Sequence, residues 1–169
     1  LRKKITQEEC TSIFELESSL LPVLFEMKTK GVRVDVQKAE KTKKDLAKIE
    51  KSLIQEIVKE TGVTVEPWVA TSVAKVFDAV GLPYSRTEKS GAPMFTKQVL
   101  ANNTHPIAQK IIKIREINKA NTTFVDTILE HSHNGRIHCD FHSLRSDGGG
   151  TVTGRFSSSN PNLQQIPAR

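Results

Sequence analysis

Apolar residues recur every three or four positions over most of this chain, and after Arg136 the spacing changes to every second position. The first period is typical of an amphipathic helix and the second of a half-buried strand. We therefore expect an α+β fold that is mostly α-helical, with long antiparallel helices followed by a β-hairpin. Because an isolated hairpin is only marginally stable, this hairpin is expected to begin an incomplete sheet whose other strands lie beyond Arg169.

The first predicted helix covers residues 6–30. Thr6 and Glu9 have the spacing of a capping box, and Gly31 is expected to end the helix. Pro22 is expected to bend it, because proline removes one helical hydrogen bond. The predicted buried stripe consists of Ile13, Leu16, Leu20, Leu24 and Met27.

A second helix is predicted over residues 37–60, with a charged exterior rich in Lys and Glu. Its run "KAEKTKK" could contact phosphate, but acidic residues among the lysines favour an ordinary solvated face. The residues expected to be buried are Ala39, Leu46, Ile49, Leu53 and Ile57.

The middle of the chain is predicted to hold a short helix over 71–80, an exposed loop over 84–95 and another long helix from Thr104. Arg115 and Lys119 lie four residues apart and are expected to project from one flank of that helix. Two cations on a rigid face suit a phosphate backbone, and two ordinary surface cations are an equally good interpretation. The core seam of the helix is predicted to be Ile107, Ile111, Ile114, Asn118, Asn121, Val125 and Ile128.

The alternation of Ile137, Cys139 and Phe141 with polar residues predicts a strand from Arg136. The segment "SDGGG", residues 146–150, is expected to turn the chain, and "TVTGR", residues 151–155, to return as the second strand of the hairpin.

The composition narrows the class of partner. The formal net charge is +6 and the isoelectric point is about 9.4, which favours a polyanion such as nucleic acid. Two distant cysteines indicate a reducing compartment rather than a disulfide framework. The sequence has no apolar run of about 18 residues, no signal peptide and no initiator Met, so we expect a cytosolic piece of a longer protein without a membrane partner.

Common catalytic signatures are absent. The sequence contains no P-loop, dinucleotide-binding turn, HExxH or GxSxG motif. The histidines around Cys139 fit no closed four-ligand pattern, and Asp140 and Asp147 do not form a convincing catalytic pair. We therefore predict neither a metal site nor a catalytic residue in this chain.

The closing stretch "TVTGRFSSSNPNLQQIPAR" combines a flexible Gly154, the five-donor fork of Arg155 and a cluster of amides. Such donors suit the DNA minor groove, where every base pair presents acceptors. The alternative is a turn-rich loop whose amides satisfy its own backbone, and composition alone favours that alternative. The amides are those of Asn160, Asn162, Gln164 and Gln165.

The amino-acid sequence of this stretch resembles a segment of family A DNA polymerases, the bacterial and phage DNA polymerase I type. "TGR", "SSS", "PNLQ" and "IP" stand in the family's order. "LESSLLPVLFEMKTKGVRVD" resembles the junction between the exonuclease-like and polymerase domains, "KVFDAVGLP", "TEKSG" and "IREINK" resemble the thumb, and "GRIHCDF" resembles the first palm strand. The resemblance implies a linker helix over 1–30, a helical thumb over 31–131 and the first palm strands over 132–169.

The same resemblance implies roles for particular residues. Arg155 would reach the minor groove at the primer terminus and the sugar of the incoming deoxynucleotide, and Arg169 would lie next to the nucleotide site. Thumb contacts to DNA would come from Lys89 and Ser90 at its tip and from Arg115 and Lys119 on its long helix. The template and primer would be contacted near the active site by Asn162, Gln164 and Gln165.

The chain departs from the family in several places, which include "MFT" after Pro93 in place of a more polar Ser/Thr stretch and "WVATS" without the usual Asn-Ser pair. Gln165 stands where Asn is usual and Asn160 where Asp is usual, and both keep hydrogen-bonding capacity. The family's first metal-binding Asp follows the equivalent of Arg169, so the ligands of the parent enzyme's two Mg²⁺ ions are outside this chain. The fragment alone is expected to be inactive, and its partners to be primer-template DNA, deoxynucleotide and the remaining palm and fingers, on the same or another chain. The expected location is the cytoplasm of a bacterium or phage-infected cell.

Two other interpretations remain open on the sequence. One is a non-catalytic nucleic-acid-binding module, and the other is a helical protein-interaction domain whose Lys/Glu-rich helix pairs with a partner.

Overall fold

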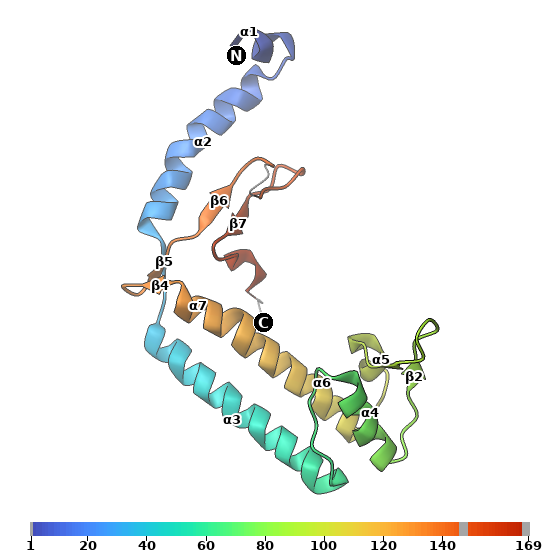
Figure 1. The fold of residues 1–169 in the computed structure, drawn as a ribbon. Coiled ribbons are helices and arrows are strands. Elements are labelled where there is room, and N and C mark those ends of the chain that lie inside the picture. Colours follow the sequence, from blue (N-terminus) through green and yellow to red (C-terminus); the bar gives the residue numbers. More distant parts are fainter. Residues whose placement is uncertain (1, 146–148, 167–169) are drawn as a thin grey trace. The chain divides into compact units, whose positions relative to one another are not determined.

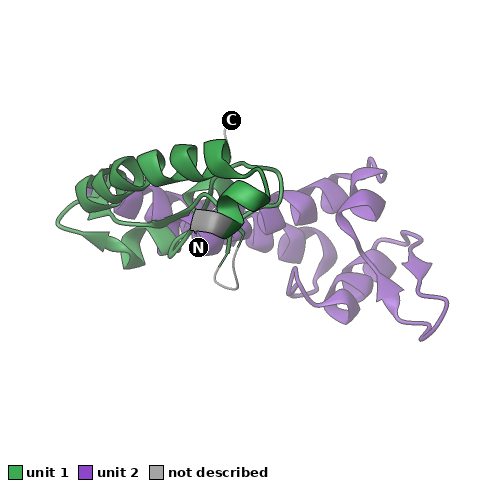
Figure 2. Ribbon diagram, turned by 90° about the horizontal axis from the view of Figure 1, so that it is seen from above, with its two compact units in different colours: residues 1–36, 127–169 green, residues 37–126 purple. Residues whose placement is uncertain are grey.

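The computed structural model describes residues 2–145 and 149–166. The chain divides into two compact units, one formed by Leu1–Val36 with Thr127–Arg169 and the other by Gln37–Asp126 (Figure 2). We call them unit 1 and unit 2 and describe each by itself.

Unit 2 is built around two long helical stretches. Helix α3 (Val36–Thr61) lies beside α6 (Pro106–Lys119), which continues into the π-helix η1 (Ala120–Val125) (Figure 1). The next helix in sequence, α7 (Asp126–Glu130), belongs to unit 1 from Thr127 onward. Between α3 and α6 in sequence come α4 (Ala70–Ala79), the antiparallel strands β2 (Ser85–Arg86) and β3 (Pro93–Met94), and α5 (Lys97–Ala101).

The core of unit 2 lies where α4, α5 and α6 meet one end of α3. The rings of Phe77 and Phe95 lie 4.8 Å apart, and Tyr84 packs edge-on to Phe77 at 6.3 Å. Helix α6 begins at Pro106, whose missing N–H costs nothing at that position, and the His105 side chain caps it by accepting from the Ile107 amide. The buried core consists of Ile57, Val65, Val73, Ala74, Val76, Phe77, Phe95, Leu100, Ile107, Ala108, Ile111 and Ile114.

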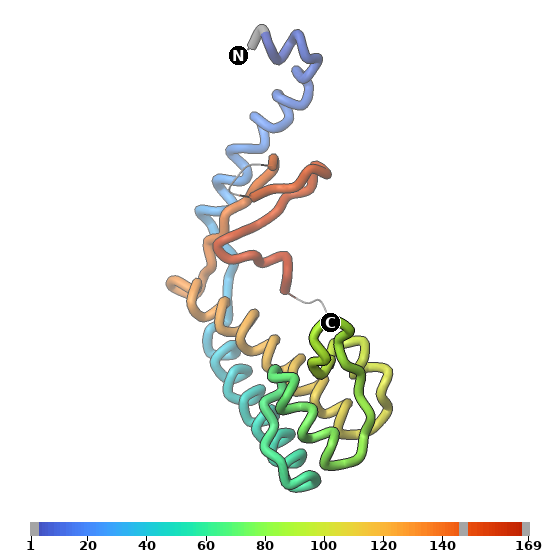
Figure 3. The backbone as a smooth tube through the Cα atoms, turned by 45° about the vertical axis from the view of Figure 1, so that its right-hand side comes forward, coloured from blue at the N-terminus to red at the C-terminus, as the bar shows by residue number. Residues whose placement is uncertain are grey.

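Unit 1 joins the beginning of the chain to its end. Strand β1 (Val32–Arg33) pairs with β5 (Arg136–Ile137), and β5 pairs with β4 (Ser132–His133), which gives an antiparallel sheet of order β1-β5-β4. A second ladder pairs β6 (Asp140–His142) with β7 (Ser157–Ser159). Helices α1 (Arg2–Gln7) and α2 (Thr11–Lys30) precede these strands, and α2 lies beside β6 (Figure 3). The 3₁₀ turn η2 (Leu163–Gln165) follows β7.

The predicted α+β class, mostly helical, is confirmed, but the first helix was predicted wrongly at its start. The chain breaks between α1 and α2 at Glu9, whose φ is 55°, and Thr6 lies inside α1, so these two residues form no capping box. Helix α2 continues through Pro22 and ends at Gly31, whose φ of 65° favours glycine.

Two predicted buried stripes are also wrong in part. Helix α2 buries none of its residues, and Ile13, Leu16 and Met27 are largely exposed. In α3 the side chain of Ile57 is buried, whereas Ile49 is 45% exposed. Both helices therefore keep apolar side chains that are exposed among the described residues.

The segment 84–95 is a hairpin rather than a loop, because Tyr84 and Phe95 at its two ends pack together with ring centroids 5.2 Å apart. Helix α5 was not predicted. The strand expected from Arg136 is interrupted between β5 and β6, and the returning strand is Ser157–Ser159 rather than residues 151–155. Of the predicted turn, residues 146–148 lie outside the described residues.

In the part of the chain that is described, no helix combines the length and the apolar content needed to cross a membrane.

Candidate nucleic-acid interface

Arg115 is held inside unit 2 by three contacts. Its Nε donates to the backbone oxygen of Pro67 at 2.7 Å, and its Nη1 donates to the backbone oxygen of Phe95 at 2.6 Å. The guanidinium carbon lies 5.4 Å from the ring centroid of Trp68, within the range of a cation–π contact. Burial lowers the pKa of Arg115 from its ordinary value. This arginine thus fixes two earlier segments of the chain, at Pro67 and at Phe95, to α6.

Arg115 and Lys119 line one pocket of about 290 Å³, as the helical spacing predicted. Its wall includes the apolar side chains of Leu100 and Ile112. Lys119 is exposed, whereas Arg115 is half-buried. The pocket therefore places the exposed Lys119 beside Arg115, whose guanidinium already bonds to two backbone oxygens.

Trp68 is the residue of this pocket that sequence reasoning missed. The residue is 57% exposed, and its Nε1 donates to Oδ1 of Asn118 at 3.0 Å. Asn118 in turn donates from Nδ2 to Glu50 Oε1 at 3.0 Å, which joins α6 to α3. The lone tryptophan next to Pro67 was the available signal, but nothing local connected it with Asn118, 50 residues further along the chain.

Lys89 and Ser90 lie in the turn between β2 and β3, and both are exposed. The Ser90 hydroxyl is 2.7 Å from the hydroxyl of Thr87, and the Gly91 amide donates to the Thr87 oxygen at 2.9 Å. The turn is thus closed by its own hydrogen bonds and presents the Lys89 ammonium outward.

Arg155 is exposed in unit 1, on a segment tied by its backbone. The Thr151 hydroxyl donates to the backbone oxygen of Arg155 at 2.7 Å, and the preceding Gly154 has a φ of 70°. The side chain takes no part in that contact. The side chain is exposed, so a ligand can reach its guanidinium.

The amides after β7 are partly used within the chain. Oδ1 of Asn162 accepts from the Gln164 amide at 3.1 Å and from the Ser158 hydroxyl at 3.3 Å, and so caps η2. Gln164 donates from Nε2 to the Phe156 oxygen at 3.0 Å. Gln165 is exposed. Asn162 and Gln164 thus bond within the turn, as expected for a turn that satisfies its own backbone. The Nδ2 donors of Asn162, whose oxygen alone is used in these bonds, and the exposed amide of Gln165 can still reach a ligand.

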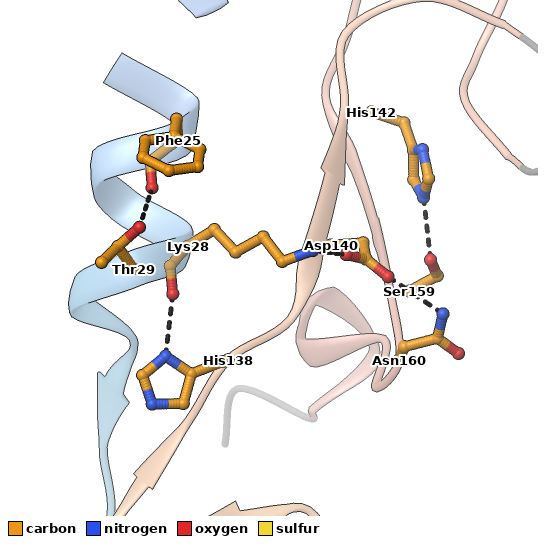
Figure 4. Close-up of polar contacts among 8 residues, drawn as sticks. All are labelled: Phe25, Lys28, Thr29, His138, Asp140, His142, Ser159 and Asn160. Carbon is orange, nitrogen blue, oxygen red and sulfur yellow. Dashed lines mark hydrogen bonds and ion pairs between the residues drawn. The ribbon is translucent and has the colours of Figure 1, made fainter. Parts of the chain in front are cut away.

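A network of polar contacts joins α2 to the two strands that lead into this turn (Figure 4). Lys28 pairs with Oδ1 of Asp140, and Asn160 donates from Nδ2 to Oδ2 of Asp140 at 3.0 Å. The hydrogen bonds from Lys28 and Asn160 lower the pKa of Asp140 below its ordinary value. His138 contacts the Lys28 oxygen through Nδ1 at 2.8 Å, and Nε2 of His142 lies 2.8 Å from the Ser159 hydroxyl.

The predicted site residues therefore fall into two groups. Lys89, Ser90, Arg115 and Lys119 belong to unit 2, and Arg155, Asn162, Gln164 and Gln165 belong to unit 1. Arg169 lies outside the described residues. Within residues 2–145 and 149–166, no three His, Cys, Asp or Glu side chains gather in a way that could hold a metal ion.

Comparison with known proteins identifies the family. The family model for DNA polymerase family A matches residues 36–169. A DNA-directed DNA polymerase of Pseudomonas phage M6 is 32% identical over 99% of this chain and 26% of its own length. The thermostable DNA polymerase I of Thermus aquaticus is 35% identical over 92% of this chain and 19% of its own length.

The fold also has a counterpart among solved structures. The polymerase domain of Pol1 from M. smegmatis, in complex with DNA primer-template and dNTP, matches with a TM-score of 0.75 and 24% identity over 99% of this chain and 30% of that chain. This likeness concerns the fold. The chain spans about a quarter of the phage relative and about a fifth of the Thermus relative. The match of the family model over most of the chain, together with these identities, shows that the chain belongs to DNA polymerase family A.

Proposed function

We propose that this chain is the thumb and the beginning of the palm of a DNA-directed DNA polymerase, and that it holds primer-template DNA. In this proposal residues 1–30 are a linker helix after an exonuclease-like domain, 31–131 the thumb and 132–169 the first palm strands. The parent enzyme performs template-directed nucleotidyl transfer in replication or repair. The chain by itself performs no chemistry.

The observation that carries the proposal is the exposed Arg155 beside a turn whose backbone is already satisfied. Because Asn162 and Thr151 hold that backbone, the Arg155 guanidinium and the free amide donors of Asn162 and Gln165 can act on a ligand. The minor groove presents acceptors at every base pair, so donors there test the geometry of a pair without reading sequence. We assign Arg155, Asn162, Gln164 and Gln165 to the primer terminus and the template beside it.

Unit 2 supplies cations for the phosphate backbone. Lys119 lies exposed at its pocket, and Lys89 is exposed at the tip of the hairpin. Phosphate contacts position a protein on DNA without specifying sequence. We assign Lys89, Ser90, Arg115 and Lys119 to the duplex backbone, with Arg115 acting through the guanidinium donors left over from its two internal bonds.

The nucleotide and its metal ions belong to the parent enzyme. We assign Arg155, and Arg169 from its place in the sequence, to the incoming deoxynucleotide. No acidic cluster among the described residues fits Mg²⁺. The ions that would stabilise charge on the reacting phosphates are therefore assigned to carboxylates elsewhere in the polymerase.

The remaining palm and fingers, on the same or another chain, are the proposed protein partner. Helix α2 buries none of its side chains and leaves several large apolar ones exposed. Burial of such a face is a strong driving force for association. The exposed apolar residues of α2 are Ile13, Phe14, Leu16, Leu21, Val23, Phe25 and Met27.

The proposed location is the cytoplasm of a bacterium or a phage-infected cell.

The test is fluorescence anisotropy of this chain with three labelled DNAs of equal length: a recessed primer-template, a plain duplex and a single strand. We expect the primer-template to bind most tightly, with an affinity that falls steeply with salt. Equal affinity for all three would favour a nucleic-acid-binding module without a polymerase role. Absence of binding at low salt, with the chain folded, would favour a protein-interaction domain. Primer extension after addition of the remaining polymerase polypeptide then tests the parent activity.

A further inference from the structure

The side chain of Asn160 is held by a carboxylate that comes from the opposite strand. Strands β6 and β7 pair Asp140 with Ser159, so the residue after Ser159 leaves the ladder next to the Asp140 carboxylate. There Asn160 donates from Nδ2 to Asp140 Oδ2 at 3.0 Å. The other carboxylate oxygen is occupied by the Lys28 ammonium from helix α2 (Figure 4). One carboxylate thus ties the exit of β7 to a helix that precedes it by more than a hundred residues.

This contact supports a left-handed backbone conformation, which asparagine tolerates better than most non-glycine residues. Asn160 has a φ of 53°, in the left-handed region. A non-glycine residue there carries strain of about 1 kcal/mol or more unless neighbouring groups hold it. Pro161, which follows, is buried. The bond to Asp140 and the burial of Pro161 together set the direction in which the chain enters the turn of Asn162 to Gln165.

We propose that Lys28, Asp140 and Asn160 form a positioning device for the DNA-contacting turn, with Asp140 as its central positioning residue. The ion pair with Lys28 orients the Asp140 carboxylate, and this carboxylate orients Asn160. The orientation of Asn160 sets the position of the capped turn that carries Asn162, Gln164 and Gln165. Lys28, Asp140 and Asn160 need not touch DNA themselves. The inference rests on the proposed function for the identity of the ligand, but the mechanical part of it concerns the chain alone.

The device also accounts for the amide at residue 160. An aspartate there would place a second carboxylate about 3 Å from Asp140, and two carboxylates at that distance repel each other. An amide supplies the N–H donor that the existing carboxylate needs. The amide at residue 160 is therefore matched to the carboxylate of Asp140.

The experiment compares four variants by two measurements. The variants are Asp140→Ala, Asp140→Asn, Asn160→Asp and the double variant Asp140→Asn/Asn160→Asp, which exchanges donor and acceptor. One measurement is hydrogen exchange of the Gln164 amide without DNA, since that amide is bonded to Asn162 Oδ1. The other is the affinity for a recessed primer-template relative to a plain duplex. Far-UV circular dichroism establishes that each variant is folded.

We expect Asp140→Ala and Asn160→Asp each to speed exchange at Gln164 about tenfold and to weaken primer-template binding about tenfold, with duplex binding unchanged. Asp140→Asn, which keeps an acceptor but loses the ion pair, should show a smaller effect. The double variant should bring both measurements back to the level of Asp140→Asn alone, because a carboxylate–amide bond is re-formed with reversed polarity while the ion pair with Lys28 is still lost. A general loss of stability would not be repaired by this exchange.

Two results would overturn the proposal: unchanged exchange at Gln164 in folded Asp140→Ala, or exchange in the folded double variant that stays as fast as in Asn160→Asp. Failure of the proposed function looks different. In that case the unmodified chain would not prefer primer-template over duplex, while the exchange pattern would still follow the four variants. That pattern would retain the positioning device and remove DNA as its ligand.

Discussion

Arg115 donates from Nη1 to the backbone oxygen of Phe95 at 2.6 Å, and the same guanidinium reaches the Pro67 oxygen at 2.7 Å. The segment before α4 and the end of the hairpin are thereby fixed to α6. A cation that the family resemblance assigns to DNA is thus also a structural residue. Any experiment on this position has to separate the two roles.

Arg115→Ala is expected to lower the free energy of unfolding by about 2 kcal/mol, because two backbone oxygens lose their charged donor. Urea denaturation measures this directly. The matched control is Lys113→Ala, an exposed cation on the same helix, for which we expect a change within about 0.5 kcal/mol. Equal losses in the two variants would contradict the structural role.

Lys119→Ala is expected to leave stability unchanged and to reduce the slope of log affinity against log salt by about one, the loss of one phosphate contact. Anisotropy over a salt series with primer-template DNA gives the slope. Lys41→Ala, on the charged exterior of α3, serves as the control and should leave the slope as it is. A similar reduction for Lys41 would mean that the α3 exterior contacts DNA as well.

Arg155→Ala is expected to weaken binding to a recessed primer terminus about tenfold without destabilising the fold, because Thr151 bonds to the backbone of Arg155 and not to its side chain. Arg155→Lys keeps the charge but loses the planar fork, so it should not restore that affinity. Competition between recessed and blunt DNA is the measurement, and Arg33→Ala is the control. Full affinity of the lysine variant would show that charge alone is needed.

The Asp140 carboxylate predicts a pH dependence of stability. Lys28 first and Asn160 second hold the pKa of Asp140 below its ordinary value, so the folded state favours the ionised form. The stabilisation is complete above the unfolded pKa of about 3.9 and is lost as the pH falls through the lower folded pKa. In urea denaturation, the stability advantage of the original chain over Asp140→Asn should be present at neutral pH and shrink below about pH 4. A difference independent of pH would contradict this ion pair.

Gly31→Ala is expected to destabilise unit 1 more than Gly62→Ala destabilises unit 2. Both glycines have positive φ, 65° and 71°, but a Cβ at Gly31 would lie 2.7 Å from the His138 ring and 2.9 Å from the Ile137 oxygen, whereas nothing lies within 4 Å at Gly62. Gly62 should therefore show only the cost of the backbone conformation, about 1 kcal/mol. Thermal unfolding of both variants gives the comparison, and equal shifts would argue against a close approach at Gly31.

The long helices α3 and α6 and the ends of α2 and α4 follow from local sequence, whereas the break between α1 and α2 and the short helix α5 were not predicted. The period of α3, the Pro106 start of α6 and the glycines at 31 and 81 were sufficient to place these elements, because helical hydrogen bonds and caps involve residues only a few positions apart. The sequence did not reveal which apolar faces would be covered. Ile57 is buried and Ile49 exposed on one helix, and that depends on where α4 and α6 pack.

The second strand shows the limit of local reasoning most clearly. Residues 151–155 have strand-forming side chains, yet Ser157–Ser159 pair with β6. Strand pairing is a non-local choice, set in this hairpin by contacts such as His142 with Ser159 and Asp140 with Asn160.

The sequence by itself determined the helical periods, the basic charge and the residue types of a polymerase-like ending. Only the tertiary structure decided which of those side chains form hydrogen bonds within the protein. Arg115, Asn162 and Gln164 each have internal partners, whereas Lys119, Arg155 and Gln165 are exposed. The physical reason is that a donor's availability depends on which acceptors the fold brings within about 3 Å, and in the case of Arg115 these belong to residues 20 and 48 positions away.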